Sequence, residues 1–282
     1  MAPLLARCHP LVTIAAWFPP ERRGLPIAIF TTWIPVGQLL AFLTAPWVYA
    51  IAGWRTMWWL GAGVALVCAL LYALTVRLPP GSEMVGVALH GSPVLSRVLR
   101  EPGPWLLAAF MGSFHVARNG FATWTPLYLV STAGWSLGDA AWVVSLCYVV
   151  SIPAALPAGW LLDRVRSART AYTWAVLLAV PALVLTYMVD PAFIVLVAVW
   201  TGALSAVVPT AVNTATPRSV GDQGLVGPAV GVVALGRNGG QLLAPLLLAP
   251  IVQAGLPWGW VGVTMAVVSV LGLAAGRRAR IN

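Results

Sequence analysis

Long apolar runs recur along this sequence, and each is about as long as a helix must be to cross a lipid bilayer. A spanning helix needs roughly 20 apolar residues, and it satisfies its own backbone hydrogen bonds in hydrocarbon. With 60% hydrophobic residues in 282 positions and a mean hydropathy of +0.88, the chain is too apolar for a soluble fold. We therefore expect an all-α, polytopic transmembrane helical bundle. Eight spans are predicted, at residues 25–51, 57–76, 105–129, 140–162, 171–189, 192–215, 225–252 and 258–275.

The distribution of arginine predicts how these helices are oriented, since the chain contains no lysine. Most arginines lie before the first span or after the second, fourth, sixth and eighth spans, and the other loops hold only Arg55. Because positively charged loops stay in the cytoplasm, we expect an integral protein of a bacterial inner membrane with a cytoplasmic C-terminus. The net charge of +9 is then an orientation signal. It gives no support to a nucleic-acid partner, whereas membrane lipid is an expected one.

The residue types that usually perform catalysis do not cluster in this sequence. The cysteines and histidines are far apart and form no metal-binding or redox spacing; they are Cys8, Cys68, Cys147, His9, His90 and His115. The sequence also has no nucleophile elbow and no glycine-rich phosphate loop. We therefore expect neither an enzyme nor a cofactor or metal site.

Two similar segments indicate an internal duplication. GQLLAFLTAP at residues 37–46 lies in the first predicted span, and GQLLAPLLLAP at residues 240–250 lies in the seventh. A separation of six spans is what a parallel duplication of a six-helix unit produces, as in some secondary transporters. The repeat therefore predicts a two-half transporter architecture.

The repeat also predicts how the chain divides. We expect residues 1–76 to be a remnant of the N-terminal half, residues 77–103 to be a cytoplasmic linker, and residues 104–282 to form the C-terminal six-helix half. Shifting the third span back by the offset between the two copies places the start of the first half about a hundred residues before Met1. The short N-terminus is thus expected to be either natural or the result of a misplaced start.

Two motifs give the chain a family resemblance. WFPPERRGLPIAIF at residues 17–30 resembles the junction of the fourth and fifth helices of the major facilitator superfamily, and GWLLDRVRSAR at residues 159–169 resembles its loop motif in the second half. The resemblance implies a partial major facilitator fold that lacks the first three helices and most of the fourth, whose stub begins the chain. It also implies transport by alternating access.

The loop motif implies a conformational latch. Gly159, Asp163 and Arg164 match the family pattern, whereas Arg166 stands where the motif has a second glycine. An Asp and Arg pair can form charge-assisted bonds to a neighbouring helix end in one conformation and release them in the other. The alternative is that the arginines of this loop only set its orientation in the membrane.

Polar residues inside the predicted spans indicate the substrate. Arg118 and Arg237 lie near the middle of the third and seventh spans, where a cation is costly and usually faces a cavity or a partner. His115 shares a helix face with Arg118, and Asn238 and Gln241 accompany Arg237. Neither span carries a carboxylate in mid-membrane, so these five residues predict a site for an anion. Alternatively, backbone carbonyls or a carboxylate on other helices satisfy the arginines.

His115 and the glycines of the seventh span have further possible roles. His115 is either a proton carrier or a neutral group that bonds across helices. The pairs Gly227 with Gly231 and Gly236 with Gly240 have the spacing that lets two helices approach closely. We expect these glycines to serve packing.

Together these features predict a secondary active transporter of a small organic or inorganic anion that works by alternating access. The expected partners are this small molecule and membrane lipid, with no nucleic acid. The alternative is a membrane protein that does not transport, either truncated or dependent on a partner.

Overall fold

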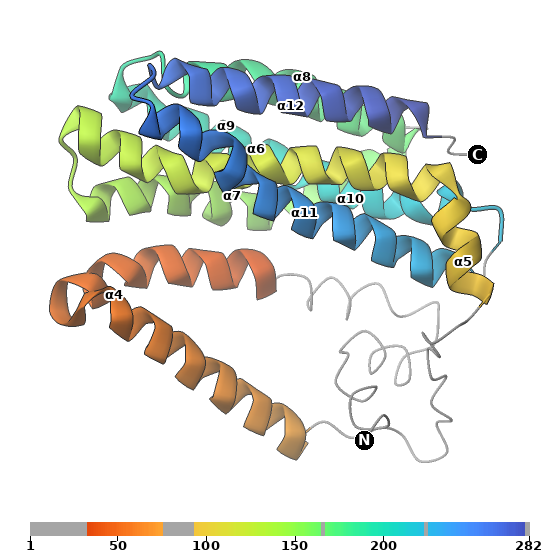
Figure 1. Cartoon of the computed structure of the whole chain (residues 1–282), viewed down its shortest axis with the longest axis horizontal. Coiled ribbons are helices and arrows are strands. Elements are labelled where there is room, and N and C mark those ends of the chain that lie inside the picture. The colour runs from red at the N-terminus through yellow and green to blue at the C-terminus, as the bar shows by residue number, and fades with distance from the viewer. Residues whose placement is uncertain (1–32, 76–92, 165–166, 223–224, 280–282) are drawn as a thin grey trace. The chain divides into compact units, whose positions relative to one another are not determined.

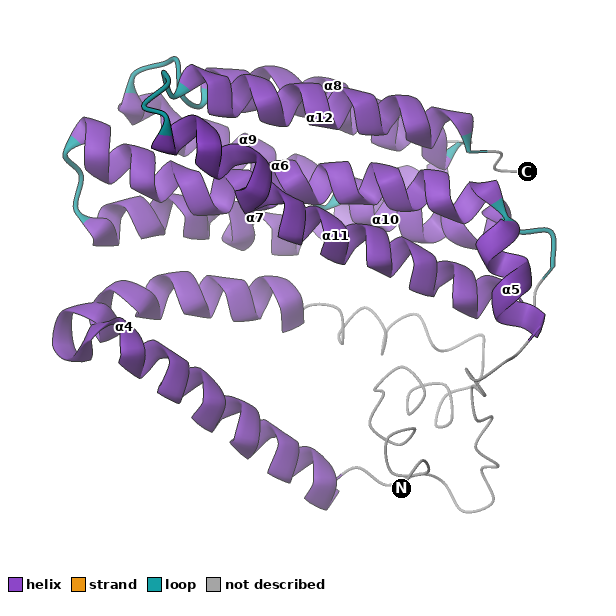
Figure 2. Ribbon diagram, viewed as in Figure 1, coloured by secondary structure: helices purple, strands orange, loops and turns teal. Residues whose placement is uncertain are grey.

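The computed structural model describes residues 33–75, 93–164, 167–222 and 225–279. Within these ranges the chain is helical apart from short connections, as Figure 2 shows, and the all-α prediction is confirmed. The chain divides into two compact units, Met1–Gly91 and Ser92–Asn282. The boundary falls inside the predicted linker. The predicted N-terminal stub and most of that linker lie outside the described residues.

The described part of the first unit is a single long helix, α4 (Trp33–Thr75), with a sharp bend. The bend lies at Gly53, whose φ of 74° and ψ of 173° are not helical, and a positive φ of this kind suits glycine, which has no Cβ. Figure 1 shows the two arms of α4 meeting at this bend. The described parts of the first and second predicted spans fall on these two arms, so a one-residue break replaces the loop that we expected between them.

The second unit is a bundle of helices that run alongside one another (Figure 1). The α6 helix packs against α11 and α12, α7 packs against α9, and α8 packs against α10 and α12. The helices of this unit are α5 (Pro93–Arg100), α6 (Pro102–Ala133), α7 (Leu137–Arg164), α8 (Ala168–Leu185), α9 (Ile194–Ser205), α10 (Val207–Ala215), α11 (Val226–Gln253) and α12 (Gly259–Arg278), with 3-10 turns at η2 (Pro191–Phe193) and η3 (Thr216–Ser219).

All six spans predicted for the second unit are helical, but the one at 192–215 is interrupted. It begins with η2 and then splits into α9 and α10 at Ala206. Pro209, in the first turn of α10, has no N–H to offer the carbonyl of Ser205, which lies four residues earlier. The internal proline therefore explains why one predicted helix becomes two.

Five helical stretches in the described ranges are long and apolar enough to cross a membrane. They are Ile34–Thr75, Leu137–Ala155, Pro191–Ser219, Val226–Gln253 and Gly259–Arg278. The α8 helix, over Arg169–Leu185, is apolar but shorter. The α6 helix is long enough, but His115, Arg118 and Asn119 make its centre more polar. Two predicted spans are therefore not among these five, the short α8 and the α6 helix with its polar centre.

Glycines bring α6 and α11 into backbone contact. A Cβ atom on Gly112 would lie 2.8 Å from the carbonyl oxygen of Gly236, and a Cβ on Gly240 would overlap the backbone of Gly112. The predicted packing role of Gly236 and Gly240 is therefore confirmed. At Gly227 and Gly231, in contrast, an added Cβ atom would have nothing within 4 Å, so these two glycines do not bring helices together within the described part of this unit.

The short helix α5 packs on the rest of the second unit through the buried Val98, with Val94 and Leu95 partly buried beside it, and also forms an ion pair. Val98 is fully buried, and Arg97 lies 3.2 Å from Asp222, which precedes α11. The neighbours of Val98 in this apolar cluster are Ala108, Val220, Leu225, Ala229 and Val232. Residues expected to be cytoplasmic linker thus include a helix that packs on the bundle.

At the same end of the unit, α8 holds the end of α12. Arg169 donates a hydrogen bond of 2.6 Å to the carbonyl of Ala279, and the hydroxyl of Tyr172 donates one of 2.9 Å to the carbonyl of Gly276. The last turn of a helix leaves its carbonyls without helical partners. These two side chains supply partners at or beside the end of α12.

Candidate functional site

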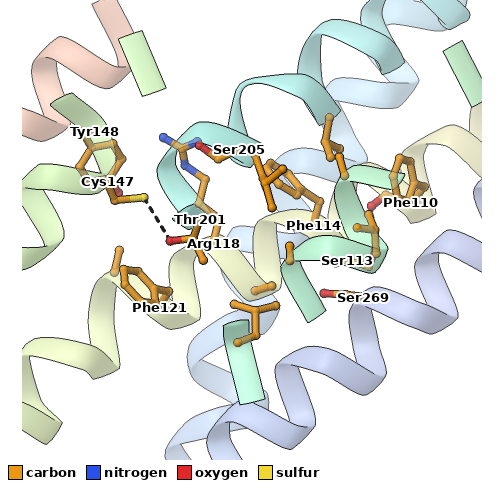
Figure 3. A pocket seen from close by; sticks show the side chains of 18 of the residues that line it. Phe110, Ser113, Phe114, Arg118, Phe121, Cys147, Tyr148, Thr201, Ser205 and Ser269 are labelled. Atoms are coloured by element: carbon orange, nitrogen blue, oxygen red, sulfur yellow. Dashed lines mark hydrogen bonds between the residues drawn. The ribbon is translucent and has the colours of Figure 1, made fainter. Parts of the chain in front are cut away.

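A cavity lies inside the second unit, between α6, α7, α8, α9, α10 and α12 (Figure 3). Its volume is about 50 Å³, which is room for a few water molecules. Aromatic and aliphatic side chains form most of its wall, including Phe110, Phe114, Phe121, Val144 and Val208. The polar groups on this wall are few, so the chemistry of the cavity depends on each of them.

Arg118 is the charged residue on this wall. It lies at the centre of α6, and its guanidinium carbon is 5.0 Å from the centroid of the Tyr148 ring, a distance at which a cation and an aromatic face attract each other. Figure 3 shows the side chain of Arg118 extending between Tyr148 and Ser205. The positive charge is therefore held at the cavity by a ring from α7.

The hydroxyl groups of the cavity are mostly engaged with their own helices. Each donates a hydrogen bond of 2.7–2.8 Å to a backbone carbonyl three or four residues earlier, and the residues concerned are Ser113, Thr201, Ser205 and Ser269. The thiol of Cys147 lies 3.9 Å from the hydroxyl of Thr201, as Figure 3 marks. Because each hydroxyl has one proton, these four groups remain mainly as acceptors.

His115 is buried on α6 beside this site but is not part of the cavity wall. Its Nδ1 atom lies 3.0 Å from the carbonyl oxygen of Met111. A carbonyl only accepts, so Nδ1 donates and Nε2 is the acceptor in the neutral ring. This bond stays within α6, and a bond across helices, one of the two alternatives for His115, stays a prediction.

Arg237 lies on α11, away from the cavity wall. Its Nε atom is buried without a hydrogen-bond partner in the described ranges. Asn238 and Gln241 lie on the same helix, and both are exposed. Of the five predicted residues, the cavity includes Arg118 alone; a role for the other four in binding stays a prediction.

The predicted latch lies at the end of α7. Gly159, Asp163 and Arg164 belong to the last turns of that helix, but their side chains lie outside the described part of the chain. The latch therefore also stays a prediction.

Sequence reasoning did not identify the residues that surround Arg118. Tyr148 and Cys147 come from α7, and Thr201 and Ser205 come from α9. The spacing of Thr201 and Ser205, four residues apart on one helix face, was a usable signal. Nothing in the sequence alone indicated that this face meets Arg118.

The sequence is similar to several curated bacterial proteins. It is 27% identical over 201 residues to the glycerol-3-phosphate transporter of Bacillus subtilis (strain 168), a match that covers 64% of this chain and 45% of that protein. It is 28% identical over 187 residues to an MFS-type efflux pump of Mycolicibacterium smegmatis, covering 63% of this chain and 43% of the relative. A D-galactonate transporter of Escherichia coli O6:H1 is 22% identical over 175 residues, with 53% and 40% covered. The chain spans less than half the length of these relatives.

The fold and a family pattern agree with these similarities. The structure superposes on the crystal structure of a bacterial homolog of the human lysosomal transporter Spinster, in its inward-facing and occupied conformation, with a TM-score of 0.67 and 16% identity. This match covers 95% of this chain and 72% of the other. The sequence also matches the pattern of the Major Facilitator Superfamily over residues 10–227 and again over residues 134–280. The protein is therefore an integral membrane protein that belongs to the Major Facilitator Superfamily.

Proposed function

We propose that this chain acts in secondary active transport of a small anion by alternating access, with Arg118 as the group that binds the anion. The observation that carries the proposal is a guanidinium that lies at the centre of α6 and on the wall of a cavity. A cation at that depth is retained when it faces a partner or a substrate.

The placement of the carboxylates supports an anion as that partner. The described acidic side chains lie at the starts of helices or between them, at Glu101, Asp139, Asp190 and Asp222. Arg118 therefore has no carboxylate from the middle of a described helix to neutralise it. Its planar guanidinium offers five N–H donors, which suit the two oxygens of a carboxylate or phosphate.

The relatives point to the same chemistry. Glycerol-3-phosphate carries a phosphate group and D-galactonate carries a carboxylate, and these are the compounds named for two of the similar transporters. Each is a small organic anion. A transporter of this kind needs a cationic residue inside the membrane, which Arg118 and Arg237 supply.

The remaining predicted residues receive secondary roles in this proposal. Arg237, Asn238 and Gln241 form a second polar group on α11 that contacts the anion at another stage of transport. His115 is the proposed proton carrier, through its Nε2 atom. Asp163 and Arg164, with Gly159 allowing close approach, latch one conformation. If Asp163→Asn leaves both exchange rate and the balance of accessible conformations unchanged, the latch is wrong.

The distribution of arginines among the helix ends supports a proposal for the orientation in the membrane. Arg97 lies on α5, Arg169 at the start of α8, and Arg277 and Arg278 at the end of α12, and the bond from Arg169 to Ala279 brings two of these ends together. The opposite end holds an aromatic group of Tyr128, Tyr187 and Trp258. We propose that the arginine-rich end, with the C-terminus, faces the cytoplasm, beside anionic lipid.

Anion exchange in liposomes tests the proposed function. The 282-residue chain, purified and reconstituted, is expected to exchange external radiolabelled phosphate, glycerol-3-phosphate or a small carboxylate for the same unlabelled anion inside. Arg118→Gln should reduce exchange at least tenfold. Arg278→Gln, at an exposed position at the end of α12, is the matched control and should leave exchange unchanged. If the chain exchanges none of these anions, or if Arg118→Gln exchanges normally, the proposal is wrong.

A further inference from the structure

We infer that the transported anion carries a short apolar group and that the cavity of the second unit binds this group while Arg118 binds the charged end. The substrate class is then a small aliphatic monoanion, such as a carboxylate with a few carbons. This inference rests on the proposed function and names the substrate that the same site takes. It distinguishes this chain from the relatives named for glycerol-3-phosphate and D-galactonate, which are polyhydroxylated compounds.

The wall of the cavity is mostly apolar. Three phenylalanine rings from α6, at Phe110, Phe114 and Phe121, face aliphatic side chains from α7 and α10, including Val144 and Val208. Such a surface is favourable for hydrocarbon and unfavourable for hydroxyl groups, which lose their hydrogen bonds to water on entering it.

The hydroxyl groups on the cavity wall also disfavour a sugar acid, because they are already hydrogen-bonded to backbone carbonyls. A sugar acid needs hydrogen-bond donors and acceptors along its whole length, because a buried polar group without a partner weakens binding. The protons of Ser113, Thr201, Ser205 and Ser269 are already donated to backbone carbonyls. These four hydroxyls can accept hydrogen bonds but have no proton left to donate, so the hydroxyl oxygens of a sugar acid would find few donors here besides Arg118.

The size of the cavity limits the apolar group. Its volume of about 50 Å³ is roughly a third of that of an engineered protein cavity, about 150 Å³, that binds benzene. This space suits about two or three carbon atoms. Each added methylene should therefore strengthen binding about fourfold until the cavity is full, after which binding should weaken.

The test measures binding of a homologous series to the whole chain in lipid nanodiscs by isothermal titration calorimetry. The probes are formate, acetate, propionate, butyrate and hexanoate, with D-galactonate and glycerol-3-phosphate for comparison. We expect affinity to rise about fourfold per methylene up to propionate or butyrate and then to fall. Butyrate should bind at least tenfold more tightly than either polyhydroxylated anion.

Two variants with opposite effects connect this length dependence to the cavity. Ala175→Leu adds volume at a buried wall position and should shift the optimum to a shorter chain, whereas Val144→Ala enlarges the cavity and should shift it to a longer one. Ala109→Leu, at an exposed position on α6, is the matched control and should leave the optimum unchanged. Thermal unfolding identifies any variant that fails to fold. If either Ala175→Leu or Val144→Ala fails to fold, the shift in the optimum is read from the other.

The outcomes separate this inference from the proposed function. If D-galactonate or glycerol-3-phosphate binds more tightly than butyrate and Arg118→Gln abolishes that binding, the apolar substrate class is wrong and anion binding stands. If both cavity variants keep the wild-type optimum, the length dependence does not come from this cavity and the inference is wrong. If no anion of either kind binds, the proposed function itself fails.

Discussion

Gly112 on α6 and Gly236 on α11 touch through their backbones, because a Cβ atom on Gly112 would lie 2.8 Å from the carbonyl oxygen of Gly236. Apolar side chains gain little by leaving lipid for a helix interface, so membrane helices rely on close packing at small residues. This contact joins the helix that carries Arg118 to the helix that carries Arg237. The separation of the two guanidinium groups therefore depends on a pair of glycines.

The first prediction concerns this contact. Gly112→Ala should destabilise the protein by about 1–3 kcal/mol, because the added methyl group forces two packed backbones apart. The measurement is the free energy of unfolding in mixed detergent micelles. Gly231→Ala, on α11 where nothing lies within 4 Å of the added methyl, is the control and should be neutral or slightly stabilising. Equal destabilisation by the two substitutions would contradict the packing role.

The second prediction concerns the hydrogen bond between Tyr172 and Gly276. Tyr172→Phe removes the donor and leaves a buried carbonyl without that partner, so it should cost about 1 kcal/mol of unfolding free energy. The ring itself still packs on Phe110, with centroids 4.7 Å apart. Amide exchange near the end of α12 should therefore speed up more than exchange in α6. Tyr49→Phe, at an exposed position in α4, serves as the control; a similar effect there would show that the hydrogen bond is unimportant.

The third prediction concerns Tyr148, whose ring faces the guanidinium of Arg118. Tyr148→Leu removes the aromatic face and should weaken anion binding by roughly 0.5–2 kcal/mol, because the ring helps to hold the cation in place. Tyr148→Phe keeps the face and should retain most of the affinity. The measurement is the dissociation constant for a small carboxylate, and a larger loss in the Phe variant than in the Leu variant would refute the ring contact.

The helices could be predicted from the sequence because their cause is local. Each predicted span within the described ranges contains a helix, although α8 ends at Leu185, before the end of its predicted span, and Pro209 supplies the reason for the break at Ala206. The position of the bend at Gly53 could not be predicted from the sequence, since any of several glycines and prolines near it provides a flexible or kinked backbone. Local sequence thus predicts the helices better than it predicts the bends and breaks between them.

The candidate site could be predicted only in part because its composition depends on which helix faces meet. Arg118 was identifiable because a cation in an apolar run is costly wherever the run packs. Tyr148 and Thr201 are ordinary residues of apolar helices, and they matter only because α7 and α9 pack beside α6. The predicted grouping of Arg118 with Arg237 failed to include these neighbours for the same reason: position along a helix does not specify its partners.

The fourth prediction compares two contacts of α5, the buried side chain of Val98 and the ion pair between Arg97 and Asp222. Val98 is fully buried, whereas the side chains of Arg97 and Asp222 are 59% and 47% exposed. Truncating a buried valine should cost about 2 kcal/mol, but an exposed ion pair contributes at most about 1 kcal/mol and is screened by salt.

Hydrogen exchange of the α5 amides distinguishes these contributions, because local opening of a short helix reports the free energy that holds it in place. Val98→Ala should speed exchange about thirtyfold at any ionic strength, and Arg97→Ala should speed it at most about fivefold at low salt and hardly at all in concentrated salt. If Arg97→Ala has the larger effect and it persists in salt, then charge rather than burial anchors α5. The same measurement therefore shows whether burial of Val98 or the ion pair between Arg97 and Asp222 contributes more to holding α5 on the second unit.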